Sequence, residues 1–187
     1  MERRSVLKGA ALLPAAVAAT ATTANADGHG GTTAFVLVHG SWHGAWCWGL
    51  IEPLLEAAGH MSIAIDLPGH GLSARNPQAF VQRPLDPAAF ATEPSSLAAI
   101  PIADYAAAVT EAATRARAAG AERVVAVGHS MGGVPVTFAA AGAPDLFDDI
   151  IYVAALAPTP GKPAGAYLAG EDQAANSKIG NVIMADP

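Results

Sequence analysis

The sequence predicts an α/β protein: a parallel sheet with helices on both faces. Short apolar runs alternate along the chain with segments in which apolar residues recur at helical spacing. Each apolar run is continuous, as expected of a strand that is buried on both faces of a sheet. The 187 residues are 52% hydrophobic and 14% charged. Such a chain can form one sizeable core and is not disordered.

The first half of the sheet is expected early in the chain. Residues 34–38 form a first strand, and residues 51–58 form a helix that stops at Gly59. Residues 61–65 form a second strand and lead into a turn rich in glycine. Residues 76–101 contain five prolines and no periodicity, so we expect a long excursion over the surface.

The second half repeats the alternation. Residues 102–116 are expected to form a helix, residues 123–127 a third strand, residues 134–141 a helix and residues 150–154 a fourth strand. Parallel strands separated by helices require right-handed crossovers. From residue 158 onward the chain is rich in proline, glycine and alanine, and no further strand is predicted.

Residues 1–26 are predicted to be a signal peptide of the twin-arginine type. Arg3 and Arg4 precede a run of small apolar residues, and Ala24-Asn25-Ala26 fits a signal peptidase site. The run is too short and too rich in alanine for a membrane span. We therefore expect a bacterial protein exported by the twin-arginine (Tat) machinery, with residues 27–33 as a linker. The alternative is a frayed cytoplasmic tail.

Charge and cysteine content exclude several classes of protein. The formal net charge is −6, and no Lys/Arg cluster lies outside the extreme N-terminus, so a nucleic-acid-binding surface is not expected. The single cysteine, Cys47, excludes an internal disulfide and is interpreted as a packed thiol. We predict no metal and no organic cofactor.

The segment Gly128-His129-Ser130-Met131-Gly132 fits the G-x-S-x-G pattern of a nucleophile elbow. An apolar strand precedes it and a helix follows it, which is the context that the pattern requires. Gly128 and Gly132 leave room for the sharp turn. Ser130 is therefore the predicted nucleophile, and the helix N-terminus favours developing negative charge beside it. The alternative is a glycine-rich turn with an idle serine.

A second element follows the first strand. His39-Gly40-Ser41-Trp42 is expected at the same edge of the sheet as the elbow. Acyl transfer needs two N–H donors for the tetrahedral oxyanion, and we predict the backbone N–H groups of Met131 and Ser41. Gly40, Trp42 and His129 are predicted to contact the substrate. Trp46 and Trp48 would support an apolar acyl pocket, with core packing as the alternative.

These segments resemble the α/β-hydrolase superfamily. The resemblance is carried by residues 35–48, 54–60 and 66–71 and by the elbow, and it is strongest to plant methylesterases and hydroxynitrile lyases with their bacterial esterase relatives. It implies the α/β-hydrolase fold, Ser130 as nucleophile, and Ser41 and Met131 as oxyanion-hole residues. The lyases carry threonine where this chain has Gly40, so the resemblance favours ester hydrolysis.

The chain departs from the family in the residues that should follow the nucleophile. In this fold an acid and then a histidine follow the serine, but all six histidines precede Ser130. Asp145, Asp148 and Asp149 precede the fourth strand, which is the wrong end of the sheet for catalysis. The triad acid and base are therefore predicted to be not present in this chain. No substitute base is favoured: His29 lies in the linker, His129 directly precedes Ser130, and the loop residues His39, His43 and His70 have no orienting carboxylate.

We accordingly expect a C-terminally truncated hydrolase. Residues 34–157 would be the N-terminal part of the core, and residues 158–187 the start of a cap. A sheet that ends after four strands should leave an apolar edge. The complete protein would be a carboxylesterase that forms an acyl-enzyme on Ser130 with a small-molecule ester. The alternatives are an inactive binding module, and C–C hydrolase or hydroxynitrile lyase chemistry on the same fold.

Overall fold

The structure is a computed structural model that describes residues 31–159 of the chain. The predicted signal peptide, residues 1–26, lies outside the described residues. So does nearly all of the predicted cap segment, from residue 160 onward.

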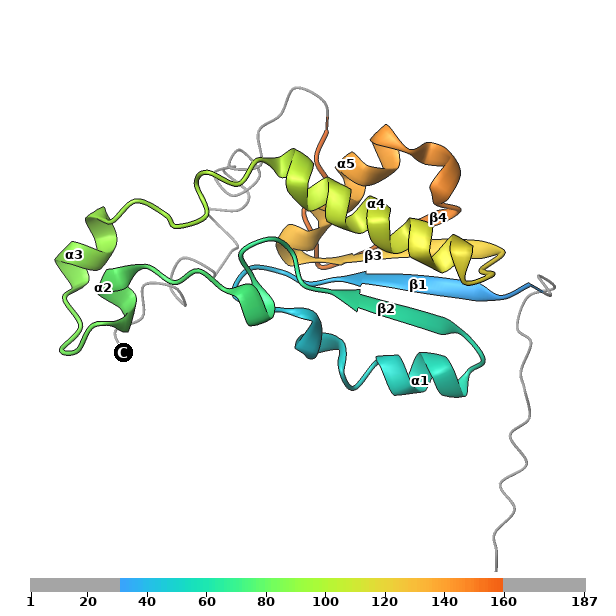
Figure 1. Ribbon diagram of the computed structural model, residues 1–187, viewed down its shortest axis with the longest axis horizontal. Helices are drawn as coiled ribbons and strands as arrows, with labels where there is room; N and C mark the ends of the chain where they lie inside the picture. Colours follow the sequence, from blue (N-terminus) through green and yellow to red (C-terminus); the bar gives the residue numbers. More distant parts are fainter. Residues whose placement is uncertain (1–30, 160–187) are drawn as a thin grey trace, which may run out of the picture.

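The described residues form a four-stranded sheet in the order β2-β1-β3-β4, and every neighbouring pair is parallel (Figure 1). The strands are β1 (Thr33–Val38), β2 (Met61–Ile65), β3 (Arg123–His129) and β4 (Asp149–Val153). All four predicted strands are confirmed. Because β1 pairs with both β2 and β3, it lies inside the sheet, and its carboxyl end lies beside that of β3.

Helices cover both faces of the sheet, as predicted. Figure 1 shows α1 (Glu52–Ala57) below the sheet and α4 (Ile102–Ala118) and α5 (Gly133–Gly142) above it. Between residues 31 and 159, four short 3-10 helices complete the connections: η1 (Ala45–Trp48), η2 (Gly71–Ser73), η3 (Ser130–Gly132) and η4 (Pro144–Leu146).

Alternating side chains of β1 explain why its sequence is apolar from Ala34 to Val38. Val36 and Val38 are fully buried in the core that also contains Val109 of α4 and Val136 of α5. Leu37, between them in sequence, points to the opposite face, where Trp48 and Leu55 pack. Successive side chains of a strand point to opposite faces, so a strand covered on both faces has no polar position.

The excursion over residues 76–101 contains two short helices that the sequence did not predict. They are α2 (Gln78–Val81) and α3 (Pro87–Thr92), and they project beyond the sheet (Figure 1). Asp86 caps α3, since its Oδ1 accepts hydrogen bonds from the N–H groups of Ala88 and Ala89 at 2.9 and 3.1 Å. Helices this short show no recognisable apolar period, so pattern analysis misses them.

β4 is an edge strand among the described residues. Ile151, Tyr152 and Val153 are all exposed, which agrees with the predicted apolar edge. In the part of the chain that the structure covers, no helix combines the length and apolar character needed to span a membrane.

Candidate functional site

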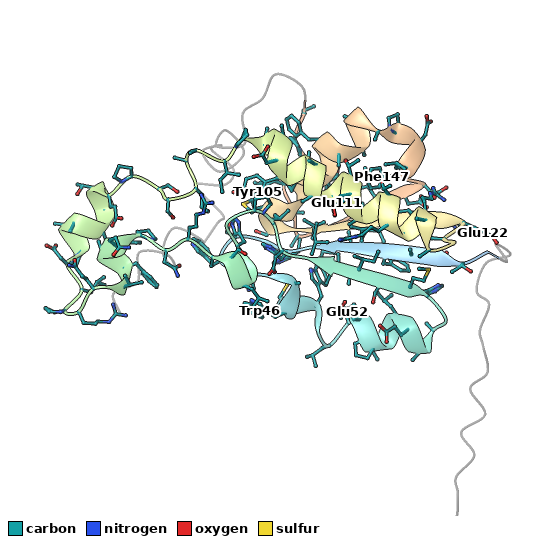
Figure 2. The ribbon with its side chains drawn as sticks, viewed as in Figure 1. Trp46, Glu52, Tyr105, Glu111, Glu122 and Phe147 are labelled. Carbon is teal, nitrogen blue, oxygen red and sulfur yellow. The ribbon has the colours of Figure 1, made fainter. Side chains whose placement is uncertain are left out.

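The candidate site lies at the edge of the sheet where the parallel strands end. The segments that follow β1, β2 and β3 meet at this edge. In Figure 2, Trp46 and Tyr105 lie toward this end of the molecule, and Glu122 lies at the opposite end.

Ser130 occupies the turn between β3 and η3 in a left-handed backbone conformation, with φ of 53°. This conformation costs a residue other than glycine roughly 1–2 kcal/mol, so the surrounding structure must hold it. One such contact is a hydrogen bond of 2.9 Å from the N–H of Leu156 to the carbonyl oxygen of Ser130. The backbone thus has the strained strand-to-helix turn that the G-x-S-x-G pattern predicts.

Two glycines allow this turn to pack. A Cβ atom on Gly128 would lie 2.8 Å from the backbone of Gly132 and Gly133. A Cβ atom on Gly132 would lie 2.5 Å from the carbonyl oxygen of His39 and 2.7 Å from that of Val38. The steric requirement proposed for both positions is therefore present, and the elbow packs directly against the end of β1.

The structure brings residues 39–41, the predicted oxyanion loop, into contact with the elbow. A Cβ atom on Gly40 would lie 2.8 Å from Cβ of Ser130 and 3.1 Å from Nδ1 of His129. The Ser41 hydroxyl donates a hydrogen bond of 3.5 Å to Sδ of Met131. Gly40, Ser41, His129, Ser130 and Met131, predicted from two distant segments, therefore lie together.

His39 ends the buried apolar run of β1 and has no exposed surface. Its Nε2 accepts a hydrogen bond of 3.0 Å from the N–H of Leu67, and its Nδ1 is 2.7 Å from the carbonyl oxygen of Gly40. Burial lowers the pKa of this imidazole. Both ring nitrogens are engaged, so His39 cannot act as a base for Ser130.

The other two loop histidines considered as substitute bases are held by backbone carbonyls. Nδ1 of His43 is 2.7 Å from the carbonyl oxygen of Ser41, and Nδ1 of His70 is 3.0 Å from that of Pro68. The His43 ring also lies 5.3 Å from the Trp46 ring and 6.2 Å from the His129 ring. Within residues 31–159, no imidazole forms a hydrogen bond with the Ser130 hydroxyl.

Asp66, at the end of β2, ties two loops of this edge together. One carboxylate oxygen accepts a hydrogen bond of 2.6 Å from the N–H of Ala45, and the other accepts one of 2.9 Å from the N–H of Leu72. Burial raises the pKa of Asp66, but these two N–H donors and nearby histidines outweigh it, and the net pKa is lowered. The sequence predicts Asp66 only as part of the turn after the second strand.

The three tryptophans have different surroundings. Trp42 and Trp46 are 80% and 65% exposed, so core packing is the wrong interpretation for Trp46. Trp48 packs in the core on the α1 face. Trp42 has φ of 60° and directly follows the predicted oxyanion loop. Cys47 is half-buried, and burial raises the pKa of its thiol.

The acidic residues near β4 lie at the amino end of the strands, as predicted. Asp148 forms an ion pair of 2.7 Å with Arg117, and Asp149 forms one with Arg123. These carboxylates bind the start of β4 to neighbouring elements and are remote from Ser130.

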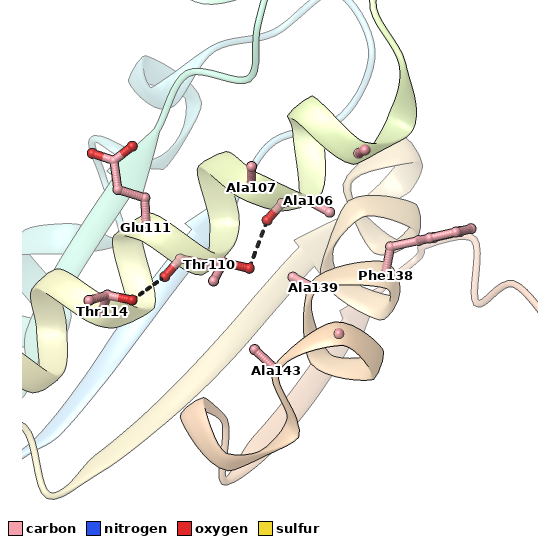
Figure 3. A pocket seen from close by; sticks show the side chains of 10 residues that line it. Ala106, Ala107, Thr110, Glu111, Thr114, Phe138, Ala139 and Ala143 are labelled. Carbon is pink, nitrogen blue, oxygen red and sulfur yellow. Dashed lines mark hydrogen bonds between the residues drawn. The ribbon is translucent and has the colours of Figure 1, made fainter.

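A separate groove of about 610 Å³ runs between α4 and α5 (Figure 3). Small side chains dominate it, including Ala106, Ala107 and Ala139. The hydroxyls of Thr110 and Thr114 donate to carbonyl oxygens of their own helix. The groove therefore offers little for polar recognition and contains no residue of the candidate site. Nowhere in residues 31–159 do three or more metal-ligating side chains converge on a metal site.

Two features define the α/β-hydrolase class. The parallel sheet has helices on both faces, and a strained serine at its carboxyl edge packs against the loop that contains Gly40. The chain belongs to the alpha/beta hydrolase family, whose family model matches residues 35–182.

Several relatives of known identity are plant proteins. Norfluorocurarine synthase 1 of Strychnos is 34% identical over 134 residues, which are 72% of this chain and 42% of that protein. Methylesterase 1 of Arabidopsis thaliana is 34% identical over 125 residues, which are 66% of this chain and 40% of that protein. This chain thus spans about two fifths of the length of the curated relatives it matches.

The solved structure of polyneuridine aldehyde esterase is also similar to this chain. The TM-score is 0.56 at 26% identity, and the match covers 79% of this chain and 49% of that one. This likeness confirms the predicted fold.

The prediction of a bacterial exported protein is wrong. The relatives that match this chain in Strychnos, Arabidopsis and rice are plant proteins, several of them named as esterases, and they point to a plant rather than a bacterial origin. A pair of arginines before a run of small apolar residues is too short a pattern to establish an export route.

Proposed function

We propose that the protein to which this chain belongs is a hydrolase of carboxylic esters in which Ser130 is the nucleophile. The observation that carries the proposal is the left-handed conformation of Ser130 at a strand-to-helix turn, with Gly40 packed against its Cβ. Ser130 is partly buried, and backbone strain of this kind is typical of an active site. Esterases among the relatives and solved structures support the same reaction class.

In the proposed reaction, Oγ of Ser130 attacks the ester carbonyl carbon and gives up its proton to a base. The tetrahedral oxyanion accepts hydrogen bonds from the backbone N–H groups of Met131 and Ser41. The carbon–alkoxide bond then breaks, the alcohol leaves with a proton, and an acyl-enzyme remains. Water attacks the acyl-enzyme, which releases the carboxylic acid and restores Ser130.

We propose that the base lies outside residues 31–159. His39 has both ring nitrogens engaged, and His43 and His70 are each held by a backbone carbonyl. His129 precedes Ser130 directly, its Nδ1 lies near Gly40, and it forms no hydrogen bond with the Ser130 hydroxyl within residues 31–159. In the family, the acid and the histidine come later in the chain than the serine.

The walls of the site suggest a small ester with an apolar part. Gly40 and His129 lie beside Ser130, and the exposed Trp42 follows the oxyanion loop. Gly40 also favours hydrolysis over hydroxynitrile cleavage, because the lyases of the resembling branch carry threonine at this position. A threonine at position 40 would place its Cβ 2.8 Å from Cβ of Ser130, which is too close without a shift.

Labelling with a fluorescent alkyl fluorophosphonate tests the nucleophile. Ser130 Oγ forms a bond to phosphorus, fluoride leaves, and the proton passes to the solvent. We expect one adduct per chain, located on Ser130 by peptide mass spectrometry. Ser130→Ala is the matched control and should not be labelled. An adduct on another residue, or equal labelling of Ser130→Ala, would exclude Ser130 as the nucleophile.

Added imidazole tests the location of the base. If no base lies beside Ser130 in the 187-residue chain, imidazole in the buffer should accelerate labelling of the wild-type chain. Imidazole should have no effect on Ser130→Ala. Rapid labelling that imidazole leaves unchanged would show that the chain already supplies a base.

A further inference from the structure

The side chain of His39 connects the end of β1 to the loop after β2. Its ring is completely buried. Nε2 is 3.0 Å from the backbone nitrogen of Leu67, and Nδ1 is 2.7 Å from the carbonyl oxygen of Gly40. Its ring lies 5.3 Å from that of His70. The reaction proposed above uses none of these groups.

The two partners determine which ring nitrogen carries the proton. The N–H of Leu67 can only donate, so Nε2 must accept and be unprotonated. The carbonyl oxygen of Gly40 can only accept, so Nδ1 must carry a hydrogen. His39 is therefore the neutral Nδ1–H tautomer, and the hydrogen bond from Leu67 selects it.

The hydrogen bond to Gly40 also orients the next peptide group. The only cis peptide bond among residues 31–159 is Arg83–Pro84, so the Gly40–Ser41 peptide is trans and planar. In a trans peptide the C=O and N–H bonds point in opposite directions. Because the Gly40 carbonyl is held toward the buried His39 ring, the Ser41 N–H must point away from that ring.

We propose that His39 is a positioning residue for the oxyanion hole: its Nδ1–H holds the Gly40 carbonyl and so keeps the Ser41 N–H turned toward the reacting centre. The proposal rests on the proposed function of Ser130. Two contacts place this peptide beside the nucleophile. They are the close approach of Gly40 to Ser130 and the hydrogen bond from the Ser41 hydroxyl to Met131.

A rotated peptide would have a specific chemical effect. With the Gly40 carbonyl released from His39, a flip of the peptide would replace an N–H donor by a carbonyl oxygen at the oxyanion position. Loss of one oxyanion donor slows the chemical step about 100- to 1000-fold in serine hydrolases. A histidine with only a packing role would affect stability without this specific effect on the chemical step.

Two variants separate the two hydrogen bonds of His39. In His39→Asn the amide N–H takes the place of Nδ1–H and still reaches Gly40. In His39→Gln the amide oxygen takes the place of Nε2 and still accepts from Leu67, but the donor to Gly40 is lost. Both variants lose part of a buried ring, so each controls for the other in folding, which thermal unfolding measures.

The first readout is the rate of fluorophosphonate labelling of the full chain. We expect the labelling rate of His39→Asn to lie within about threefold of wild type. His39→Gln should be labelled at least about tenfold more slowly than wild type, and complete loss of one oxyanion donor sets the upper limit of this effect. Equal labelling rates for the two folded variants would overturn the proposal. Slower labelling of His39→Asn than of His39→Gln would also overturn it.

The second readout does not depend on reactivity. In nitrogen NMR spectra of the wild-type chain, we expect hydrogen on Nδ1 of His39 and none on Nε2. The Ser41 amide signal should move in His39→Gln and stay in place in His39→Asn. If wild type is not labelled even with added imidazole, the nucleophile proposal fails, and these spectra alone decide the role of His39. Hydrogen on Nε2 of His39 would overturn the proposal for His39. An unchanged Ser41 amide signal in both variants would overturn it as well.

Discussion

A single methyl group on Gly40 would separate the oxyanion loop from the nucleophile. In Gly40→Ala the new Cβ would lie 2.8 Å from Cβ of Ser130, so the loop or the elbow must shift. We expect fluorophosphonate labelling to slow at least about tenfold, with about 1–3 kcal/mol lost in free energy of unfolding. Labelling kinetics and urea unfolding measure the two effects. Wild-type labelling by Gly40→Ala would show that the loop is not part of the site.

Gly132 provides a second test at the scale of one residue. In Gly132→Ala the Cβ would lie 2.5 Å from the carbonyl oxygen of His39. Both the elbow and the end of β1 are backbone here, and backbone cannot move aside as easily as a flexible side chain. We expect a loss of about 2–4 kcal/mol in the free energy of unfolding.

Gly142 is the matched control for Gly132, because a Cβ there would meet no atom within 4 Å and the residue lies in α5. Gly142→Ala should stabilise by about 0.5–1 kcal/mol. Urea unfolding of both variants decides, and similar losses in both would contradict the packing described for the elbow.

At the scale of elements, Arg117 and Asp148 join the end of α4 to the starts of β3 and β4. Nη2 of Arg117 donates to Asp148 at 2.7 Å, and Asp148 also accepts from the N–H of Val124 at 2.7 Å. We expect Asp148→Asn to lower the free energy of unfolding by about 1–2 kcal/mol, since a partly exposed charged hydrogen bond is lost.

The exposed pair Glu111–Arg115, at 3.5 Å within α4, is the control for this junction. Glu111→Gln should change the free energy of unfolding by less than about 0.5 kcal/mol. Thermal or urea unfolding of both variants is the measurement. If the two variants have the same effect, Asp148 does not join these elements.

The elements differ in how well the sequence predicts them. β1 and β3 are buried on both faces, so their apolar runs suffice for prediction. α2 and α3 depend on individual contacts, such as the carboxylate of Glu93, which accepts from the N–H groups of Gln78 and Ala79 at 2.8 and 2.7 Å. No periodic pattern encodes such contacts.

The same difference applies to the site. The elbow was predictable because a strand-to-helix turn needs glycines at fixed spacing around Ser130. The hydrogen bonds of His39 and Asp66 were not predictable, because their partners Leu67 and Ala45 become neighbours only when β1 and β2 pair. Their one signal is a polar residue directly after a buried strand. The sequence leaves core packing open as the alternative for Trp46, because the residue type alone does not reveal the exposure of a tryptophan.

At the scale of the whole molecule, stability should fall in two stages on acidification. Burial holds the pKa of His39 below its ordinary 6.5, so below that pH the unfolded chain binds more protons than the folded one. His70, Asp66 and His43 also act on this ring, with smaller effects. Its contribution is therefore present above pH 6.5 and is lost as the pH falls through its folded pKa.

The carboxylates of Asp66 and Asp148 produce the second stage. Burial raises the pKa of each, but backbone N–H donors outweigh it, together with nearby histidines at Asp66 and the Arg117 guanidinium at Asp148. Both net pKa values lie below 3.8. Their contribution is present above 3.8 and is lost below it. Urea unfolding from pH 8 to pH 3 measures both stages. His39→Asn should lack the first stage, and its persistence in that variant would assign it to another group.

The parallel pairing of β1 has a consequence for synthesis on the ribosome. β1 pairs with β2 nearby in sequence, but its other neighbour, β3, begins at Arg123, opposite Thr33. At a synthesis rate of roughly 5–20 residues per second, one edge of β1 remains unpaired for about 5–18 s until β3 is synthesised. During that interval an apolar strand with unpaired backbone groups is open to other nascent chains, which makes β1 the segment that a ribosome-associated chaperone would most usefully shield.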